Sequence, residues 1–107
     1  LLRRTASTPA PRVLAAQPRP NPARDVTRLA FRLAADDHVG AAVYDVRGRL
    51  LRRVDLGLRR ATGDQGEPHV WVWDGRDATG RRVAAGVYWL ELTTPDDRTV
   101  RKVTLIR

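Results

Sequence analysis

The side chains that could carry out acid–base or nucleophilic chemistry are few and scattered in this 107-residue sequence. Ser7 is its only serine, and its two histidines, His38 and His69, fall in different segments. A serine–histidine–acid triad needs three side chains within hydrogen-bond reach of one another, so the sequence offers little from which to build one. Cysteine is absent, which excludes disulfides, thiolate catalysis and cysteine zinc sites. The sequence therefore predicts a protein that is not an enzyme.

Carboxylates are more frequent, but their spacing does not indicate a catalytic pair or a metal site. The adjacent acids at 36–37 and 96–97 fall in predicted turns, where such acids are usually solvated. Asp74 and Asp77 lack the i, i+2 spacing of a calcium-binding loop. Neither histidine has a second imidazole or a thiol near it in sequence. We therefore predict no catalytic residues, no metal and no cofactor.

The net charge of +8 comes from 20 Lys and Arg against 12 Asp and Glu, and more than half of it lies near the N-terminus. Residues 1–24 hold five arginines, five of the 7 prolines and no acid, which gives +5 and leaves +3 for the remainder. Such a chain could bind nucleic acid, because arginines neutralise phosphates and its 3 tryptophans could stack on bases. In the remainder, however, arginines are dispersed among acids, as on a solvated sheet face. The sequence thus favours protein partners over nucleic acid.

The apolar pattern downstream of this basic segment has a period of two, which is typical of half-buried strands. Leu29, Phe31 and Leu33 alternate with arginine and alanine, and turn residues separate each such segment from the next. The stretch 50–54 does not alternate, which predicts a bulge or an edge strand, and 57–68 is predicted to be a loop. The predicted strands span 28–33, 39–46, 49–56, 69–73, 86–94 and 99–106. Six or seven short strands without an amphipathic helix predict an all-β antiparallel sandwich.

The proline-rich start of the chain is predicted to be an extended arm over 1–17, followed by the sandwich domain over 18–107. Proline fixes φ and biases the residue before it away from helix. The chain contains no methionine, so we expect its true start to lie upstream of Leu1. No run of 18 apolar residues occurs, so no membrane-spanning helix is predicted.

Within the arm, Pro9, Pro11 and Pro18 bracket a short stretch around Val13 and Leu14. Proline is tolerated at the margins of edge strands, and an extended apolar stretch between prolines is suited to pairing with the edge of a sheet. We therefore predict that this stretch adds a strand to a neighbour.

The last three predicted strands are apolar in both phases. The phase expected to face the core consists of Trp71, Trp73, Tyr88, Leu90, Leu92, Val103 and Leu105. The opposite phase consists of Val70, Val72, Val87, Trp89, Val100 and Ile106. Strands that are apolar on both faces are usually covered on both, so we predict that another chain, or this chain's own arm, contacts the second face. The alternative is ordinary β-propensity, because valine and tryptophan suit strands even when exposed.

Three spaced stretches and the end of the chain resemble one known family. In order along the chain, the three stretches are Pro20-Asn21-Pro22 with Thr27, Phe31 and Leu33; Val43-Tyr44-Asp45-Val46-Arg47-Gly48-Arg49 with Leu51; and Trp73-Asp74-Gly75-Arg76-Asp77 with Gly80, Val83, Gly86, Val87 and Tyr88. The terminal stretch is Arg101-Lys102 before Val103 and Leu105, ending at Arg107. Together they cover about residues 18–107 and resemble the immunoglobulin-like domain of the flagellar hook-capping protein FlgD, a module also found at the C-termini of secreted bacterial proteins. The resemblance implies an immunoglobulin-like fold.

The motif residues also have structural reasons to occur. Trp73 shares a face with Trp71 and is expected to fill the core. Asp74 and Asp77 can accept backbone N–H groups in Asx turns. The other motif residues are Gly75, Gly80 and Gly86, expected where the backbone is left-handed or closely packed, and Tyr88, expected in the core. We therefore expect this constellation to build the fold rather than a binding site.

The function predicted from these features is that of a non-catalytic structural or assembly module acting by protein–protein contact at the bacterial cell surface or outside the cell. The leading hypothesis is a self-assembling filament subunit whose N-terminal arm docks on a neighbouring copy. The resemblance implies an alternative, a C-terminal sorting or attachment domain of a larger secreted protein, of the kind used by type IX secretion. A third, a role related to the flagellar hook cap, rests on fold analogy alone. The predicted partners are other copies of the chain or a parent secreted polypeptide.

Overall fold

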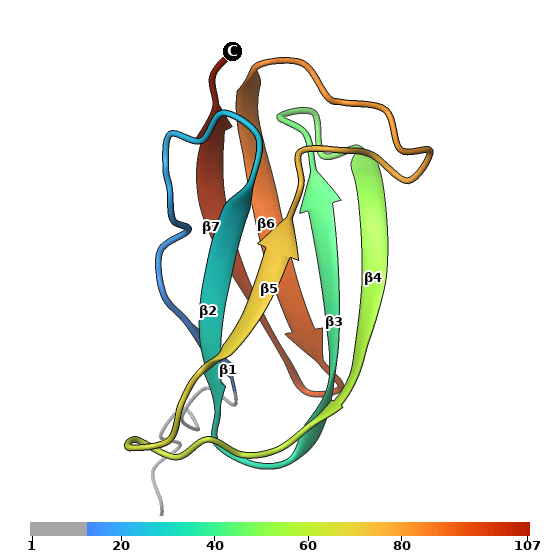
Figure 1. Cartoon of the computed structure of the whole chain (residues 1–107). Coiled ribbons are helices and arrows are strands. Elements are labelled where there is room, and N and C mark those ends of the chain that lie inside the picture. Colours follow the sequence, from blue (N-terminus) through green and yellow to red (C-terminus); the bar gives the residue numbers. More distant parts are fainter. Residues whose placement is uncertain (1–12) are drawn as a thin grey trace, which may run out of the picture.

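The computed structural model describes residues 13–107, which form two antiparallel sheets packed face to face (Figure 1). The strands are β1 (Val13–Ala15), β2 (Thr27–Leu33), β3 (Asp37–Tyr44), β4 (Leu50–Arg59), β5 (His69–Trp73), β6 (Gly86–Thr94) and β7 (Asp97–Leu105). No helix occurs among these described residues. The prediction of an all-β immunoglobulin-like sandwich of six or seven strands is therefore confirmed.

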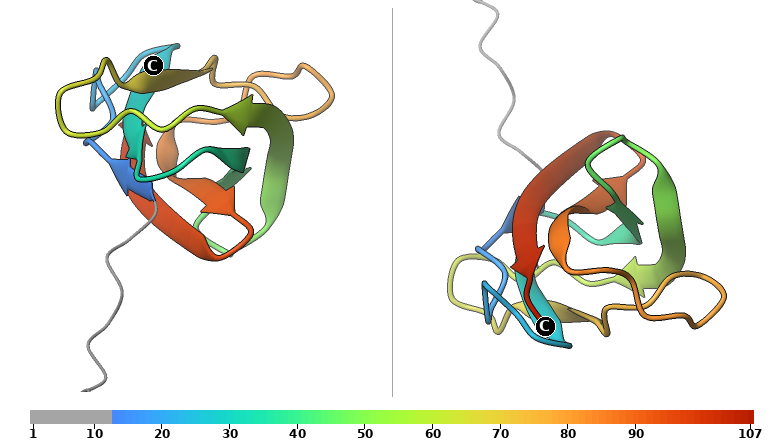
Figure 2. Two further views of the ribbon diagram at one scale, coloured as in Figure 1. Left: turned by 90° about the horizontal axis from the view of Figure 1, so that it is seen from below. Right: turned by 90° about the horizontal axis from the view of Figure 1, so that it is seen from above.

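One sheet has three strands in the order β1-β2-β5, and the other has four in the order β4-β3-β6-β7. Every pair of neighbouring strands is antiparallel. The views along the strands in Figure 2 show the two sheets enclosing a single interior. The connection after β4 carries the chain from the four-stranded sheet to the edge of the three-stranded sheet, where β5 pairs with β2.

The core lies between the sheets and is built by every second residue of the strands. The burial pattern of β6 alternates from Tyr88 to Thr94, as expected of a strand with one face inward. All seven residues predicted to face the core are buried: Trp71, Trp73, Tyr88, Leu90, Leu92, Val103 and Leu105. Burying each large apolar side chain contributes about 1.5–3 kcal/mol, so these positions supply much of the stability of the domain.

The N-terminal stretch differs from the predicted arm. Val13–Ala15 forms β1, which pairs with β2 of the same chain and places Val13 in register with Leu33. Val13 is only 1% exposed, so the sandwich begins before the predicted boundary at residue 18. The physical reason is that the edge of β2 offers both unpaired backbone groups and an apolar gap, and the chain's own residues fill both. Residues 1–12 of the predicted arm lie outside the described residues.

After β1 the chain changes sheets. Arg19 and Arg28 exchange backbone hydrogen bonds of 2.9 and 2.7 Å, so the segment still follows β2 there. Ala23 then pairs in parallel with Leu105 of β7, donating its N–H to Thr104 at 2.8 Å. This segment closes the sandwich on the side where β1 and β7 meet.

The prediction for β4 needs correction at its C-terminal end. This edge strand runs to Arg59, whereas a loop was predicted from residue 57. The pairing with β3 shifts register twice, and the shift beside Tyr44 agrees with the bulge expected from the irregular stretch. The second shift lies at Gly57, which has a φ of 76° and donates its N–H to Asp55 Oδ1 at 2.8 Å. A bulge stabilised by this hydrogen bond lets the strand continue through Gly57, a residue type that predicts a turn when only the sequence is considered.

Candidate protein-binding surfaces

The loop after β5 is organised around Trp73. Its side chain is 1% exposed, its Nε1 donates to the backbone oxygen of Arg76 at 2.9 Å, and its ring meets Tyr88 edge-on with centroids 5.4 Å apart. Asp74 Oδ1 accepts the N–H of Arg76 at 3.1 Å, as expected of an Asx turn. The buried ring thus holds the loop to the core.

Gly75 follows at a position where another residue would not fit. Its φ is +75°, in the left-handed region, and an added Cβ would lie 2.7 Å from the backbone oxygen of Asp25. Its own carbonyl accepts the N–H of Val83 at 2.9 Å, which returns the chain toward β6. The other two motif glycines, Gly80 and Gly86, also have positive φ.

Asp77 closes the second turn of this loop. Its Oδ1 accepts the hydroxyl of Thr79 at 2.6 Å and the N–H groups of Thr79 and Arg81 at 2.9 and 3.1 Å. These hydrogen bonds, chiefly that of the Thr79 hydroxyl, hold the pKa of Asp77 below its ordinary value of 3.8. Together with the contacts of Trp73 and Gly75, this geometry accounts for the loop's residues by folding alone.

We expect Asp77→Asn to lower stability at pH 7 and to reduce the loss of stability in acid. A carboxylate whose pKa is lowered by folding stabilises the protein above its unfolded pKa, and this stabilisation disappears as the pH falls through the folded pKa. The difference in urea midpoint between wild type and variant should therefore be larger at pH 7 than at pH 3 or below. Thr79→Val removes the hydroxyl that lowers the pKa of Asp77 most, so the folded-state pKa of Asp77 should rise. The loss of stability on acidification should then occur at a higher pH. Equal midpoint differences at both pH values would contradict this role for Asp77.

Tyr88, the last motif residue, is also a core residue. Its hydroxyl donates to the backbone oxygen of Ala84 at 2.5 Å, and burial raises its pKa. The two histidines do not meet. His38 Nε2 pairs with Asp55 Oδ1 at 2.7 Å on the four-stranded sheet. His69, the first residue of β5 in the three-stranded sheet, contacts the backbone oxygen of Arg60 with its Nε2 at 2.8 Å.

Neither a metal site nor a membrane span is found in residues 13–107. That part of the chain contains no group of three or more His, Asp or Glu residues that could hold a metal ion. It also contains no helix long and apolar enough to cross a membrane.

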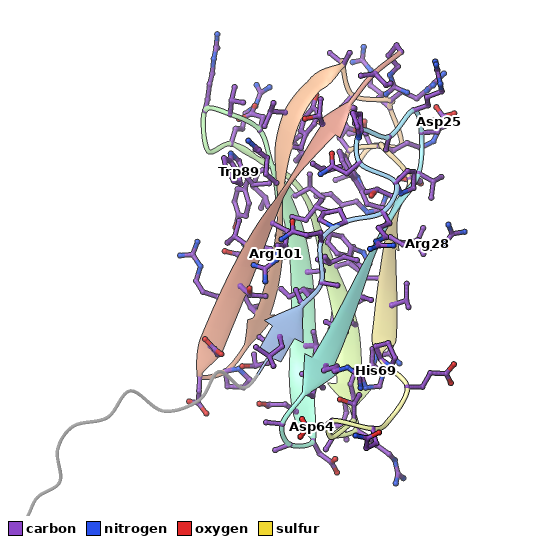
Figure 3. The ribbon with its side chains drawn as sticks, turned by 90° about the vertical axis from the view of Figure 1, so that its left-hand side faces the viewer. Asp25, Arg28, Asp64, His69, Trp89 and Arg101 are labelled. Carbon is purple, nitrogen blue, oxygen red and sulfur yellow. The ribbon has the colours of Figure 1, made fainter. Side chains whose placement is uncertain are left out.

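The second apolar face predicted for the last strands is divided between two sheets. Val70 and Val72 lie on the outer face of the three-stranded sheet because β5 pairs with β2 rather than with β6. Val87, Trp89 and Val100 lie on the outer face of the four-stranded sheet. Figure 3 shows Trp89 and Arg28, which pairs with Val72, on opposite sides of the sandwich. Ile106 follows the end of β7.

The outer face of the three-stranded sheet is apolar and basic. Leu14 is 57% exposed and lies in register with Arg32, and Val72 is 49% exposed beside Arg28. Of the predicted contact pair in the arm, therefore, only Leu14 is on the surface, because Val13 points into the core.

The outer face of the four-stranded sheet contains a trough that sequence reasoning missed. At one end is a hollow of about 470 Å³ lined by Tyr44 and Trp89, and at the other a hollow of about 390 Å³ over Gly40 and Ala42. Both hollows are lined by Glu91, so they adjoin at this residue on the outer face of β3 and β6, and together they are called the trough. The sequence did contain a signal for this trough, because the outward positions of β3 carry two small residues, Gly40 and Ala42, followed by Tyr44.

Two carboxylates of the trough, Glu91 and Asp55, are paired with neighbouring side chains. Glu91 accepts the Tyr44 hydroxyl at 3.3 Å and pairs with Arg98 Nε at 3.1 Å. Asp55, which pairs with His38, also accepts the N–H of Gly57, and this backbone hydrogen bond is the main reason that its pKa is lowered. Asp55 is therefore a carboxylate at neutral pH.

Residues 13–107 form an immunoglobulin-like β-sandwich with apolar side chains on both outer sheet faces. The chain belongs to the FlgD Ig-like domain family, whose model matches residues 22–98. The recognition of this family from the sequence is thereby confirmed.

Solved structures of similar fold include two FlgD proteins and a much larger chain. FlgD from P. aeruginosa is 25% identical with a TM-score of 0.58 over 76% of this chain and 60% of that chain. FlgD from Xanthomonas campestris is 19% identical with a TM-score of 0.58, covering 86% of this chain and 64% of that one. Dimeric latent PorU from Porphyromonas gingivalis is 23% identical with a TM-score of 0.68, covering 96% of this chain and 10% of PorU. The chain thus spans less than two thirds of each of these proteins, and no curated protein matches it.

Proposed function

We propose that this domain is a non-catalytic structural module that works outside the bacterial cell or at its surface by protein–protein contact. In the leading form of the proposal, its N-terminal segment docks on a neighbouring copy, and repetition of this contact builds a filament. A head-to-tail contact between copies generates an open assembly when the rotation between them does not close a ring.

The observation that carries this proposal is that both outer faces of the sandwich expose large apolar side chains. The proposed contacts are the exposed Leu14, Val70 and Val72 on the three-stranded sheet, and the exposed Trp89 with the half-buried Val87 and Val100 on the four-stranded sheet. Ile106, which follows β7 and is also exposed, completes the set. Apolar side chains gathered on a sheet face are typical of protein contact sites, whereas an active site needs convergent reactive groups.

The test compares the self-association of the full chain with that of a chain lacking residues 1–12. The deletion stops at residue 12 because Val13 belongs to the core. We expect the mass measured by light scattering to rise with concentration for the full chain and to stay monomeric for the shortened one. Replacing residues 1–12 with a Gly/Ser segment of equal length controls for chain length. Equal masses for all three chains at every concentration would refute the proposal.

A second candidate is a sorting or attachment domain at the end of a larger secreted protein. The observation that favours it is the match to PorU, in which a domain of this fold makes up 10% of a much longer chain. It is tested by fusing the domain to a secreted reporter in a bacterium with such a pathway. Export or surface attachment that depends on the domain would support this candidate. A hook-cap role is a third candidate, supported by the two FlgD structures.

A further inference from the structure

We propose that the trough on the outer face of the four-stranded sheet binds residues 1–12 of a second copy, held as a polyproline II segment. This inference rests on the proposed function and names the surface that receives the arm. The structure limits which part of the arm can reach a neighbour, because residues from Val13 onward pair within their own sandwich.

The trough has the shape and chemistry of a groove for an extended segment. Its floor is formed by Gly40 and Ala42, which have little or no side chain. One end is lined by Tyr44 and Trp89, which lie side by side in register on the neighbouring strands β3 and β6, and Trp89 is 38% exposed. Grooves lined by aromatic rings recognise proline-rich segments, because rigid proline rings pack on aromatic faces at little cost in entropy.

The other end of the trough offers a carboxylate. Asp55 lies in register with Gly40, four positions along β3 from Tyr44, or about 13 Å at the usual rise of a strand. The trough also contains Arg53 and Arg98, so its net charge is small. Glu91 is paired with Arg98, whereas both contacts of Asp55, with His38 and with the N–H of Gly57, use its Oδ1 and its side chain is 71% exposed. An incoming guanidinium can therefore approach Asp55 Oδ2.

The N-terminal segment carries the complementary groups. Residues 1–12 contain two prolines, three arginines and no acid, so the segment has a charge of +3. From Pro9 to Arg12 a polyproline II segment rises about 9 Å, and the long arginine side chain extends this reach. Prolines at the aromatic end therefore place Arg12 near Asp55.

The prolines at the aromatic end of the trough must come from another copy. Val13 lies in the three-stranded sheet, at the end of the sandwich that also holds the β6–β7 turn (Figure 1). Trp89 is five residues from the end of β6, about 17 Å along the strand, and the sheets are about 10 Å apart. Pro9 is four residues before Val13 and reaches at most about 14 Å. Its ring therefore cannot reach the aromatic end of its own trough.

The test titrates a synthetic peptide of residues 1–12 into the isotope-labelled full chain, at a concentration where light scattering shows monomer. We expect NMR shifts in the Trp89 indole N–H and in the amides of Gly40 and Ala42. Trp89→Ala should weaken peptide binding about tenfold, as truncation of a central aromatic contact commonly does. Asp55→Asn should weaken it about threefold, in line with loss of one exposed ion pair.

Matched variants test whether the peptide binds in the trough itself. Val26→Ala, just before β2 in the other sheet and 37% exposed, should leave the affinity unchanged. Ala42→Leu fills the floor without removing a ring and should also weaken binding, which keeps the test valid if Trp89→Ala does not fold. A peptide with serine at both proline positions should bind at least severalfold more weakly.

The outcomes also distinguish this inference from the proposed function. The trough would be excluded as the binding site if the peptide shifted NMR signals of the three-stranded sheet instead, or if Trp89→Ala and Ala42→Leu left the peptide affinity unchanged. Either result would leave the proposed arm-dependent self-association intact. The same conclusion would follow if self-association required residues 1–12 but the peptide shifted no NMR signal from the trough. Absence of both self-association and peptide binding would overturn the inference and the proposed function together.

Discussion

Val13→Asp is expected to destabilise the domain by about 4 kcal/mol, a large part of the stability of a typical small domain. The side chain of Val13 is 1% exposed, so the change loses the burial of a valine, worth about 2 kcal/mol, and places a carboxyl group in an apolar site at a cost of about 2 kcal/mol or more. Many domains of this size have a total stability of only about 5–15 kcal/mol. The measurement is urea unfolding followed by tryptophan fluorescence.

Leu14→Asp is the matched control for this prediction. It introduces the same side chain one residue along the same strand, but on the outward face, where it should change stability by no more than about 0.5 kcal/mol. Equal effects of the two substitutions would show that β1 does not pair with β2 in solution. A destabilisation seen only for Val13→Asp would establish that the sandwich includes residues before the predicted boundary at 18.

Trp73→Ala is expected to cost about 3–5 kcal/mol, as for other large buried aromatic residues. It removes the ring that packs edge-on against Tyr88 and the Nε1 donor to the backbone of Arg76, so it also frees the loop that leads to β6. The thermal midpoint measured by circular dichroism should fall accordingly, and the edge of β5 should exchange its amide protons faster.

Trp73→Phe separates the contribution of the ring from that of the hydrogen bond. It keeps an aromatic core residue and loses the indole donor, so we expect a smaller cost of about 1–2 kcal/mol. A cost for Trp73→Ala below about 1 kcal/mol would contradict the place of this side chain at the centre of the core.

Much of the fold could be predicted from residues close together in sequence. The side chains of a strand alternate between its two faces, so the inward set from Tyr88 to Leu105 could be recognised from its period of two. The motif around Trp73 could be assigned to folding because Asx turns and left-handed glycines are set by local hydrogen bonds. The interface residues remain predictions, since nothing yet tests which of them a partner contacts.

Other features depended on which strands pair. The three residues of β1 are too few for a periodic signal, and their place depends on the open edge of β2, more than ten residues away. The division of the second apolar face followed from the pairing of β5 with β2. The trough combines Tyr44, Glu91 and Asp55 from three strands, and no local pattern joins them.

The amino-acid sequence by itself determined that the chain is an all-β sandwich of the FlgD Ig-like family, which side of most strands faces inward, and that the basic charge gathers on a proline-rich N-terminal segment. The tertiary structure decided that Val13 belongs to the core, that the two apolar outer faces lie on opposite sides, and that one of them contains a trough. The reason is that alternation along a strand is set by the geometry of its own backbone, whereas surfaces are made by strand pairing between residues distant in sequence.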